Sequence, residues 1–538
     1  MPRIRRASIA AGAQPGKLGT VGTTGRIVGG QFTKNLHEGE GGDLPSVSYK
    51  EVDVDIPLTL TEVVHHEGRD LIVLRFVEGD KEDPFNWSRA KKARITLILC
   101  CMTLFIGLAT TAYSSGINRM TREFGVSVEK GQLGLFTFNM TCALAPLFLA
   151  PFCELVGRRV VYVGAYAFFV IVFIGLALGK NIGTILVMRA LSGLFGCVGT
   201  ILVGGTFSDI YRPDYRALPM ALFSYVAILG TVAAPIYAGF IDETLGWRWI
   251  EGIQGLSNIP LLILSLLFLP ETRGGVTLHK RAKALNSAIG GDMYCSHSDL
   301  DARTIKEMLH SSSVKAVKML VTEPVVLSFG LWIGFAWAVT FLFLSVIPIT
   351  YQEKRGWNEG IGGLPYISLC IGVTIGFAAN FLQIRKYNSI MKSGQGKVLP
   401  ESRLYGAMCG ACFLPIGLFI YSFTQYSQLS WVGPTIALAP IAIGIFFIFE
   451  STYSYTSDCY GEHSSSAIAG QGLMRNTLGA VTPLFASQFF RNVGSQYAGL
   501  ILALFGTLLT FIPFVMFKYG HKLRERSALA KSQMGGEK

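Results

Sequence analysis

Charged side chains are scarce in this sequence. Asp, Glu, Lys and Arg make up only 15% of its 538 residues, whereas hydrophobic residues make up 50%. A soluble chain of this length needs far more charge to cover its surface. The composition therefore argues against an ordinary soluble protein and indicates a chain that crosses a membrane many times.

Residues that build disulfide, metal or nucleophilic sites are few and scattered. Most of the ten cysteines lie in or at the ends of apolar runs, where a free thiol behaves as a small hydrophobe. Cys409 and Cys412 form a CxxC, but it lies inside such a run rather than after a strand, which argues against a redox motif. The eight histidines form no metal or nucleophile cluster, and the adjacent His65 and His66 lie in the N-terminal tail. We therefore expect no disulfide framework, no metal, no cofactor and no enzymatic activity.

The excess of positive charge is distributed in short clusters. The formal net charge is +12, and the Lys and Arg residues gather between the apolar runs. This pattern is typical of the cytoplasmic loops of a membrane protein rather than of a nucleic-acid-binding face. We expect a lipid bilayer as partner, no nucleic acid, and both termini in the cytoplasm.

Twelve apolar runs are long enough to cross a bilayer, whose core of about 30 Å requires about 20 residues per helix. The predicted spans are residues 94–116, 131–153, 160–179, 182–208, 217–240, 248–269, 325–350, 362–384, 403–424, 430–455, 467–489 and 496–517. A polar stretch separates the first six from the last six. The sequence thus predicts an all-α polytopic membrane protein, with twelve transmembrane helices in two pseudo-symmetric six-helix bundles.

The spans divide the chain into five parts. Residues 1–93 form a Gly-rich, polar N-terminal tail that we expect to be cytosolic and largely disordered. The two bundles occupy residues 94–270 and 325–518, a cytoplasmic linker occupies residues 271–324, and residues 519–538 form a cytosolic C-terminal tail. The end of the linker has apolar residues at helical spacing and cations on the other side. This pattern predicts a helix along the inner membrane surface.

Four ionisable residues interrupt or flank the apolar spans. Arg189 lies well inside the fourth span, where a guanidinium costs about 2.5–3.5 kcal/mol. We therefore expect it to face the bundle interior or a water-filled cavity, as a structural cation or as one that couples protons or binds substrate. Glu450 and Arg475 lie at similar depths in neighbouring spans, which predicts an ion pair that acts as a structural lock or as a protonatable coupling site. Glu251 lies at the outer end of the sixth span, where a hydrated carboxylate beside Arg248 is a simpler interpretation than a coupling site.

A charged turn separates the second and third spans. In PLFLAPFCELVGRR the apolar run stops at Glu154, and Gly157 permits a tight reversal before Arg158 and Arg159. The turn is therefore predicted to be a short charged hairpin at the membrane boundary.

These motifs, in this order and spacing, resemble the major facilitator superfamily, in particular the fungal twelve-span drug:proton antiporters, a group that includes polyamine exporters. The resemblance covers roughly residue 83 to the C-terminus. The matching elements are DPFNWS at 83–88, the turn with Glu154, Gly157, Arg158 and Arg159, the RxxxG element with Arg189 and Gly193, the span 5 signature with Gly230, Pro235 and Gly239, WRW followed by Glu251, and spans 10 and 11 with Asp458, Arg475 and Pro483. One element departs from the family, because span 5 reads AAPIYAG where GPxxGP is usual.

The resemblance implies the major facilitator fold and transport by alternating access, with the substrate bound between the bundles near the midplane. It also implies that Glu154, Arg158 and Arg159 form a conformational latch that stabilises the outward-facing state. Arg189 would take part in coupling to the proton gradient that drives the cycle.

The leading hypothesis is a monomeric transporter of the fungal plasma membrane that couples proton entry to the export of small organic compounds, such as drugs, polyamines or secondary metabolites. The candidates for proton coupling are Arg189, Glu450 and Glu251. Two alternatives remain open, namely an importer or uniporter of a nutrient or organic acid, and a non-transporting membrane receptor.

Overall fold

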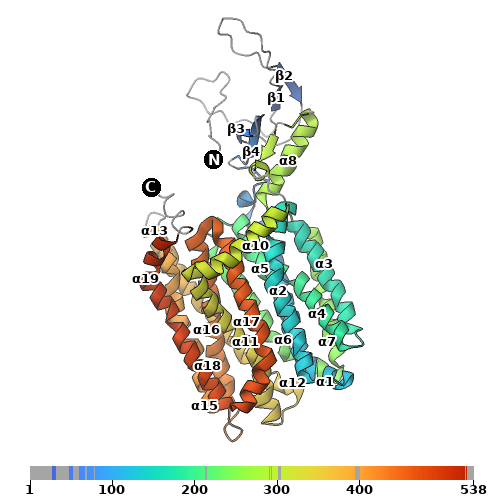
Figure 1. Cartoon of the computed structure of the whole chain (residues 1–538), viewed down its shortest axis with the longest axis vertical. Helices are drawn as coiled ribbons and strands as arrows, with labels where there is room; N and C mark the ends of the chain where they lie inside the picture. Colours follow the sequence, from blue (N-terminus) through green and yellow to red (C-terminus); the bar gives the residue numbers. More distant parts are fainter. Residues whose placement is uncertain are drawn as a thin grey trace.

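The structure is a computed structural model, and it describes the helical body of the chain and most of the linker. The residues described are 27–31, 48–52, 60–66, 69–77, 79–212, 215–289, 291–292, 294–300, 305–393, 400–527 and 529. Long helices run side by side along the body, and a small unit that contains strands lies at one end (Figure 1). We call this the linker end, because it carries α8 (Gly274–Ile289) and α10 (Ile305–Thr322) of the linker.

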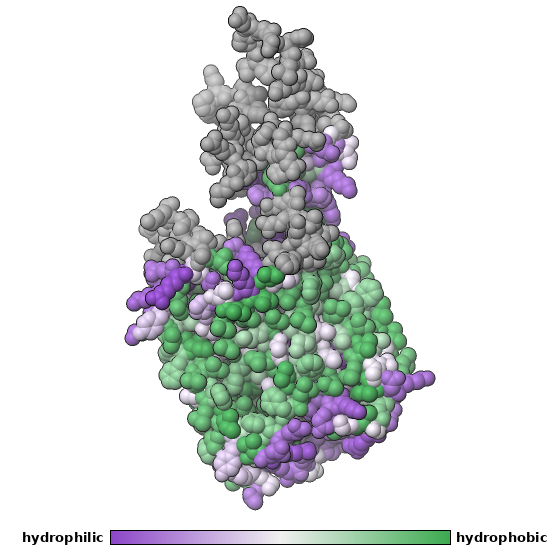
Figure 2. Space-filling view, in the orientation of Figure 1, coloured by the Kyte–Doolittle hydropathy of each residue, from purple (hydrophilic) through white to green (hydrophobic). Residues whose placement is uncertain are grey.

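The surface of the helical body is apolar around its middle. On the face shown in Figure 2, a broad hydrophobic band separates hydrophilic side chains at the two ends. Large apolar side chains stand exposed in the spans, among them Leu267, Leu382 and Leu508. Such a band is what the hydrocarbon core of a bilayer requires of the protein surface that it covers.

Two bundles make up the body. The first consists of α1 (Arg89–Phe124), α2 (Val128–Val156), α3 (Arg158–Ala177), α4 (Ile182–Gly196), α5 (Val198–Ile210), α6 (Ala217–Thr244) and α7 (Trp247–Phe268). The second consists of α11 (Pro324–Pro348), α12 (Glu359–Gly362), α13 (Tyr366–Ser393), α14 (Leu404–Gly410), α15 (Phe413–Thr424), α16 (Val432–Tyr460), α17 (Ser464–Asn492), α18 (Ser495–Thr510) and α19 (Ile512–Arg526).

Ten helical segments in the described part of the chain are long and apolar enough to cross a membrane, and each corresponds to a predicted span. The other two predicted spans are 182–208 and 467–489. The first is divided at Cys197 into α4 and α5. The second corresponds to α17, which has 29 residues but carries buried polar side chains such as Arg475 and Asn476. These polar side chains lower the mean hydropathy of α17, and they face the protein interior rather than lipid.

The two bundles repeat one packing arrangement. In the first, α1 packs along α6, and in the second, α11 packs along α17, so that the first and fifth spans of each bundle lie together. Between the bundles, α2 packs against α17, and α6 packs against α12 and α13. The pseudo-symmetric pair of bundles predicted from the sequence is thus present, and α2, α6, α13 and α17 form most of its central interface.

The linker connects the bundles across the linker end. After α8 come the short strand β5 (Tyr294–Ser296), the single turn α9 (His297–Leu300), and α10, which lies across the ends of the spans (Figure 1). The hydroxyl of Ser313 in α10 donates to the carbonyl of Leu147 in α2 at 2.8 Å, and Lys315 Nζ lies 3.0 Å from His463 Nδ1 of the second bundle. The helix predicted at the end of the linker therefore contacts both bundles.

Part of the N-terminal region differs from the expected disordered tail. Strands β3 (Leu60–His66) and β4 (Arg69–Arg75) form an antiparallel pair, and β4 pairs in parallel with β5 of the linker. A second antiparallel pair joins β1 (Ile27–Gln31) and β2 (Ser48–Val52). The segment that leads into the first span is therefore attached to the linker by a three-stranded sheet. The sequence did not indicate this pairing, because β5 has only three residues.

Candidate functional site

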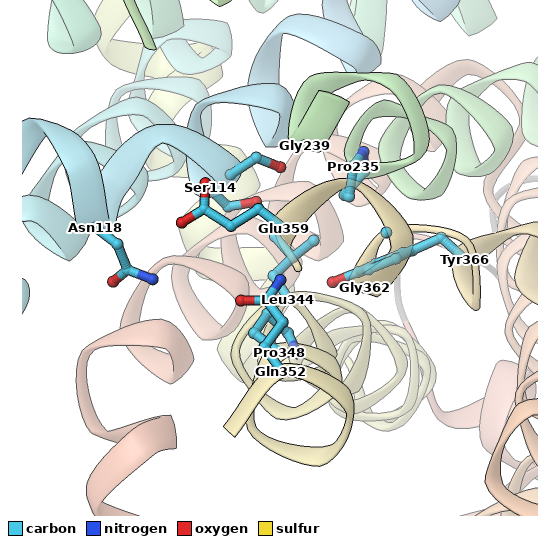
Figure 3. A pocket seen from close by; sticks show the side chains of 12 residues that line it. Ser114, Asn118, Pro235, Gly239, Leu344, Pro348, Gln352, Glu359, Gly362 and Tyr366 are labelled. Carbon is cyan, nitrogen blue, oxygen red and sulfur yellow. The ribbon is translucent and has the colours of Figure 1, made fainter. Parts of the chain in front are cut away.

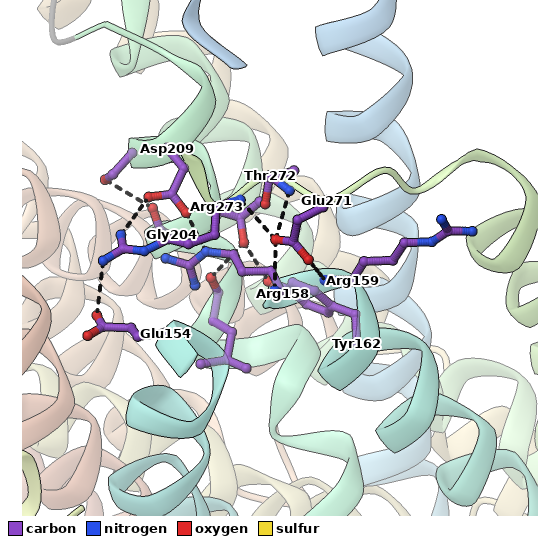
Figure 4. Close-up of polar contacts among 12 residues, drawn as sticks. Glu154, Arg158, Arg159, Tyr162, Gly204, Asp209, Glu271, Thr272 and Arg273 are labelled. Carbon is purple, nitrogen blue, oxygen red and sulfur yellow. Dashed lines mark hydrogen bonds and ion pairs between the residues drawn. The ribbon is translucent and has the colours of Figure 1, made fainter. Parts of the chain in front are cut away.

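The predicted charged turn starts α3 at the linker end, and an acidic side chain caps it (Figure 4). The carboxylate of Glu271 accepts hydrogen bonds from the backbone N–H groups of Arg158 at 2.9 Å and Arg159 at 3.1 Å. These are two of the donors that every helix leaves free at its start. Gly157 precedes them with φ +103°, and a Cβ there would meet the Glu271 carboxylate. Glycine is therefore required at this position both for backbone geometry and for space.

The side chains of this turn join four helix ends. Arg158 forms an ion pair with Asp209, at the end of α5. Arg273, which follows α7, reaches Asp209 at 3.2 Å and Glu154, near the end of α2, at 3.9 Å. Together with Glu271, these residues form what we call the linker-end cluster. The predicted latch residues thus contact neighbouring helix ends, although the carboxylate that pairs with Arg158 belongs to Asp209 rather than to Glu154.

Sequence reasoning underestimated two members of the linker-end cluster. Asp209 and Glu271 were not among the residues predicted from the sequence to form the latch. A useful signal was present for Asp209, because an acid at the end of the fourth span faces the same membrane boundary as the arginines of the turn. The guanidinium of Arg159, by contrast, lies outside the cluster and donates to the carbonyl of Leu266 at 3.1 Å.

The second bundle contains a counterpart of this cluster. Arg403, directly before α14, pairs with Asp458 near the end of α16 at 2.8 Å. Arg524 in α19 pairs with Glu401 at 2.5 Å. In both bundles, an arginine at the start of the third span therefore binds an aspartate at the end of the fourth, as pseudo-symmetry requires.

Arg189 is completely buried and bonded to backbone carbonyls. Its guanidinium donates to Ala109 at 3.0 Å and Thr110 at 2.8 Å in α1, and to Gly134 at 3.3 Å in α2. It also lies 4.5 Å from the centre of the Tyr113 ring, a cation–π distance. The expectation that Arg189 faces the bundle interior agrees with this placement, and its charge is stabilised by carbonyl dipoles and aromatic rings.

Glu251 is buried, in contrast to the hydrated carboxylate expected at the end of the sixth span. Only 3% of its surface is exposed, and Glu251 interacts electrostatically with Arg189. Its Oε2 has no hydrogen-bond partner among the residues that the structure describes. The expected neighbour, Arg248, pairs instead with Glu123 at 2.6 Å. Helical phase is the reason, because Trp247, Glu251 and Gln254 share the buried side of α7.

The ion pair predicted between Glu450 and Arg475 is not formed. Glu450 accepts hydrogen bonds from Ser454 at 2.8 Å and from Ser224, in the other bundle, at 3.0 Å. Arg475 donates to the hydroxyl of Tyr453 at 2.8 Å and to the neighbouring Asn476 side chain at 3.1 Å. Glu450 is thus directed across the bundle boundary, whereas the hydrogen-bond partners of Arg475 belong to its own bundle.

Rings flank the Arg475 guanidinium, which lies 4.9 Å from the Trp337 ring centre and 5.2 Å from that of Phe449. A small cavity between the bundles adjoins this group. It is lined by Arg475, Asn476, Trp337 and Phe341 of the second bundle and by Thr103, Gly107, Thr110, Phe138, Asn139, Cys142, Thr200, Ala227 and Thr231 of the first. Its volume is about 30 Å³, and Asn476 closes one side by donating to the Cys142 carbonyl at 3.2 Å. The cavity has room for a water molecule but not for an organic compound of drug size.

The glycines of the span 5 signature allow close helix packing. A Cβ on Gly230 would lie 2.5 Å from the carbonyl oxygen of Leu104 in α1. A Cβ on Gly239 would meet the backbone of Glu359 in α12, across the bundle interface. Gly239 and Pro235 line a second small cavity between the bundles at the end opposite the linker (Figure 3). The signature thus lies where α6 contacts both its own bundle and the other.

Comparison with known proteins identifies this architecture. The family model described as Major Facilitator Superfamily matches residues 99–483. The chain belongs to the major facilitator superfamily. This membership confirms the resemblance seen in the sequence and the predicted fold class.

Several curated fungal transporters are similar to the chain. An efflux pump, MFS2 of Trichophyton rubrum, is 32% identical over 463 residues, which are 86% of this chain and 78% of that protein. The multidrug transporter mdrA of Aspergillus fumigatus is 29% identical over 85% of this chain and 75% of its own length. The citrinin biosynthesis cluster transporter mrr1 of Monascus ruber is 32% identical over 84% and 90%, respectively.

A solved structure supports the fold independently. The proton:xylose symporter XylE aligns with a TM-score of 0.57 at 16% identity, and the alignment covers 80% of this chain and 96% of the symporter. At this identity the similarity concerns the fold. The chain is thus a multi-pass membrane transporter of the major facilitator type.

Proposed function

We propose that this transporter exports small organic compounds across the fungal plasma membrane in exchange for protons, as a monomer that works by alternating access. In this proposal the linker end and both termini lie in the cytoplasm. The concentration of Lys and Arg in the linker and in the connections at that end supports this orientation.

One observation carries the proposal, namely the buried carboxylate of Glu450 at the boundary of the two bundles. It accepts hydrogen bonds from Ser454 of its own helix and from Ser224 of the opposite bundle. An ionised carboxylate only accepts hydrogen bonds, whereas a protonated one also donates. A proton on Glu450 would therefore change the contact that joins α16 to α6, which is the kind of change that lets two bundles move apart.

Arg189 and Glu251 have a different part in this proposal. Glu251 is a buried acid whose Oε2 has no hydrogen-bond partner in the described part of the chain, and it lies within electrostatic reach of Arg189. The pair places a second protonatable group inside the first bundle, and the carbonyl-bonded guanidinium holds the compensating charge in place. Proton coupling then involves Glu450 at the bundle interface and Glu251 beside Arg189.

The cargo site would be the cavity beside Arg475, widened when the bundles separate. Its rings, amides and hydroxyls suit an aromatic compound with hydrogen-bonding groups. Arg475 has no carboxylate within ion-pair distance among the described residues. Of the cargoes considered, drugs and secondary metabolites that are neutral or acidic therefore fit better than polycationic polyamines, which the Arg475 charge would repel.

The proton gradient can supply the required work. One charge that moves through 100 mV releases about 2.3 kcal/mol, which supports a roughly 50-fold gradient of a neutral compound. One proton per cycle is therefore sufficient for useful export.

The test is accumulation of a fluorescent, neutral aromatic compound in yeast that lacks its own exporters. Expression of the chain should lower accumulation, and a protonophore should restore it. Glu450→Gln should abolish the effect at unchanged surface abundance, because glutamine cannot be ionised. Glu353→Gln is the matched control, since Glu353 is an exposed acid paired with Arg491 at the opposite end. Increased accumulation on expression would instead show import and would refute the proposal.

A further inference from the structure

A second interbundle contact closes the end opposite the linker. There α12 of the second bundle packs against the last turns of α6 in the first. Glu243 of α6 accepts hydrogen bonds from the Asn358 side chain at 3.0 Å and from the Gly360 backbone at 3.2 Å. Gly239 presents no side chain to Glu359, so that the two backbones approach closely. In the orientation proposed above, this contact is the extracellular gate.

Two acidic side chains meet within this gate, one from each bundle. Asp242 has no exposed surface, and neither of its carboxylate oxygens accepts a hydrogen bond from an N–H group or a hydroxyl among the described residues. The Glu359 side chain of α12 lies close enough to act electrostatically on this carboxylate across the bundle interface. Glu359 in turn lines the small cavity of Figure 3, together with Ser114 and Asn118. The acid pair therefore lies next to a polar pocket at the extracellular side.

A hydrogen bond between two carboxyl groups requires a proton, because an ionised carboxylate is an acceptor only. Two charged carboxylates at such close range, one of them fully buried, would repel each other strongly. The position of Asp242 adds to this effect, since it lies in the last turn of the 28-residue helix α6, where the helix dipole disfavours negative charge. The closed gate thus fits one shared proton.

The other charged groups nearby do not replace this proton. Arg119 and Arg122 of α1 act electrostatically on Asp242, but Arg119 donates to the backbone carbonyl of Asp242 rather than to its carboxylate. On α6 itself, Glu243 is bonded to the start of α12, and its negative charge adds to that of the acid pair. Glu123 is bonded to Trp247 and Arg248 of α7.

We infer that Asp242 and Glu359 form a proton-binding site shared by the two bundles, and that the proton bound there holds the extracellular gate closed. The proton comes from extracellular water and lies between one carboxylic acid and one carboxylate. Its return to extracellular water leaves two negative charges facing each other across the interface and separates α6 from α12. The orientation of the gate rests on the proposed function, whereas the proton requirement rests on the contact itself.

This site makes closure of the extracellular gate depend on external protons, whereas the proton that drives export is carried by another group. With the gate open and the cargo released, Asp242 and Glu359 are exposed to the acidic outside and take up a proton. The neutralised pair then allows α6 and α12 to close. Glu450 lies nearer the linker end of α16 and remains a separate group that responds to the cytoplasmic side.

The experiment measures the gate directly, without cargo. Spin labels are placed on cysteines introduced at Leu245 in the first bundle and Leu429 in the second, both exposed at the extracellular end. The accessible or half-buried native cysteines are replaced by serine, namely Cys101, Cys370, Cys409 and Cys412. Electron–electron resonance in lipid nanodiscs then gives the populations of short and long distances across the gate. Acidification should increase the short-distance population, with the closed-to-open ratio rising by up to about tenfold per pH unit.

Two variants decide whether this pair is responsible. Asp242→Asn together with Glu359→Gln mimics the neutral state and should hold the short distance at every pH. Glu243→Gln should weaken the gate but keep its pH dependence. An unchanged pH dependence in the double variant, or a gate distance in the unmodified pair that does not respond to pH, would overturn the inference.

A second readout applies to cells in case the labelled double variant does not fold. Each single variant, Asp242→Asn and Glu359→Gln, should move export activity to less acidic external pH at equal surface abundance. Export that stays equally dependent on external acid in both variants would contradict the inference. If no proton-coupled export occurs but the gate distance still follows pH through Asp242 and Glu359, the proposed function fails and the proton-binding site stands.

Discussion

Removal of Asp80 should release the N-terminal segment from the linker. Arg281 in α8 contacts Asp80 through two hydrogen bonds, at 2.7 and 3.1 Å, and Glu82 through a third at 2.7 Å. The side chains of Asp80 and Arg281 are 2% and 6% exposed, whereas that of Glu82 is 53% exposed. Breaking a buried ion pair costs about 3–5 kcal/mol, and we take the lower end because Glu82 still pairs with Arg281 in Asp80→Ala.

A loss of about 3 kcal/mol corresponds to a roughly 150-fold larger population of the detached state. Hydrogen exchange of the β4 amides measures this population, since β4 is paired with β5 only while the segment is attached. Exchange in β4 should therefore accelerate by about two orders of magnitude in Asp80→Ala. Glu82→Gln is the control, because an exposed ion pair contributes at most about 1 kcal/mol. Equal protection of β4 in Asp80→Ala and the unmodified protein would refute the reasoning.

The same contact predicts a dependence on pH. Burial alone would raise the pKa of Asp80, but hydrogen bonds from Arg281 and from the backbone of Glu82, together with the Arg281 charge, lower it below its ordinary value. The stabilisation is therefore complete above the unfolded pKa of about 3.9 and is lost as pH falls through the lower pKa of the attached state. Protection of β4 should be constant at neutral and mildly acidic pH and decrease only in strong acid. A decrease near neutral pH would contradict this assignment.

Two further substitutions test the bundle itself. Arg189→Ala leaves the carbonyls of Ala109, Thr110 and Gly134 without this donor, so it should lower the free energy of unfolding by about 3 kcal/mol or more. The thermal midpoint of unfolding in detergent measures this loss. An unchanged midpoint together with lost proton coupling would show that the role of Arg189 is functional and not structural. Gly239→Ala introduces a Cβ against the backbone of α12, so it should prevent full closure of the extracellular gate. The spin-label distance across the gate should then be longer at acidic pH than in the unmodified protein. An unchanged distance would show that the backbones of α6 and α12 do not need to approach this closely.

The spans, the two bundles and the charged turn were predictable because they depend on local composition. Apolar runs of sufficient length and a glycine between charged residues define them without knowledge of the neighbours. The positions of single side chains depended on helical phase, and there the predictions were less successful. Glu251 was expected in water because it lies near a helix end, but its phase on α7 turns it toward Arg189. Glu450 was expected beside Arg475 from depth alone, although its phase on α16 turns it toward Ser224.

Contacts between distant segments could not be predicted in this way. Asp242 and Glu359 each look like an ordinary acid near a polar loop, and only the packing of α12 on α6 brings them together. The same holds for Asp80 and Arg281. Asp80 belongs to the N-terminal tail and Arg281 to the linker, and nothing in the sequence indicated that these two segments contact each other. In each case the role of the side chain depends on a partner that lies more than a hundred residues away in the sequence.

The bonding of Arg189 has a mechanical consequence. A guanidinium is flat and stiff, and this one holds carbonyls of two helices from a position on a third. Sliding α1, α2 or α4 past one another by a fraction of a turn would break these hydrogen bonds together. The three helices are therefore expected to move as one rigid body. Bending during the transport cycle then has to occur at two other places, which act as hinges. These are α6, with its glycines and Pro235, and α10 of the linker. A compound that stiffened either hinge would stop the transporter without occupying its cargo cavity.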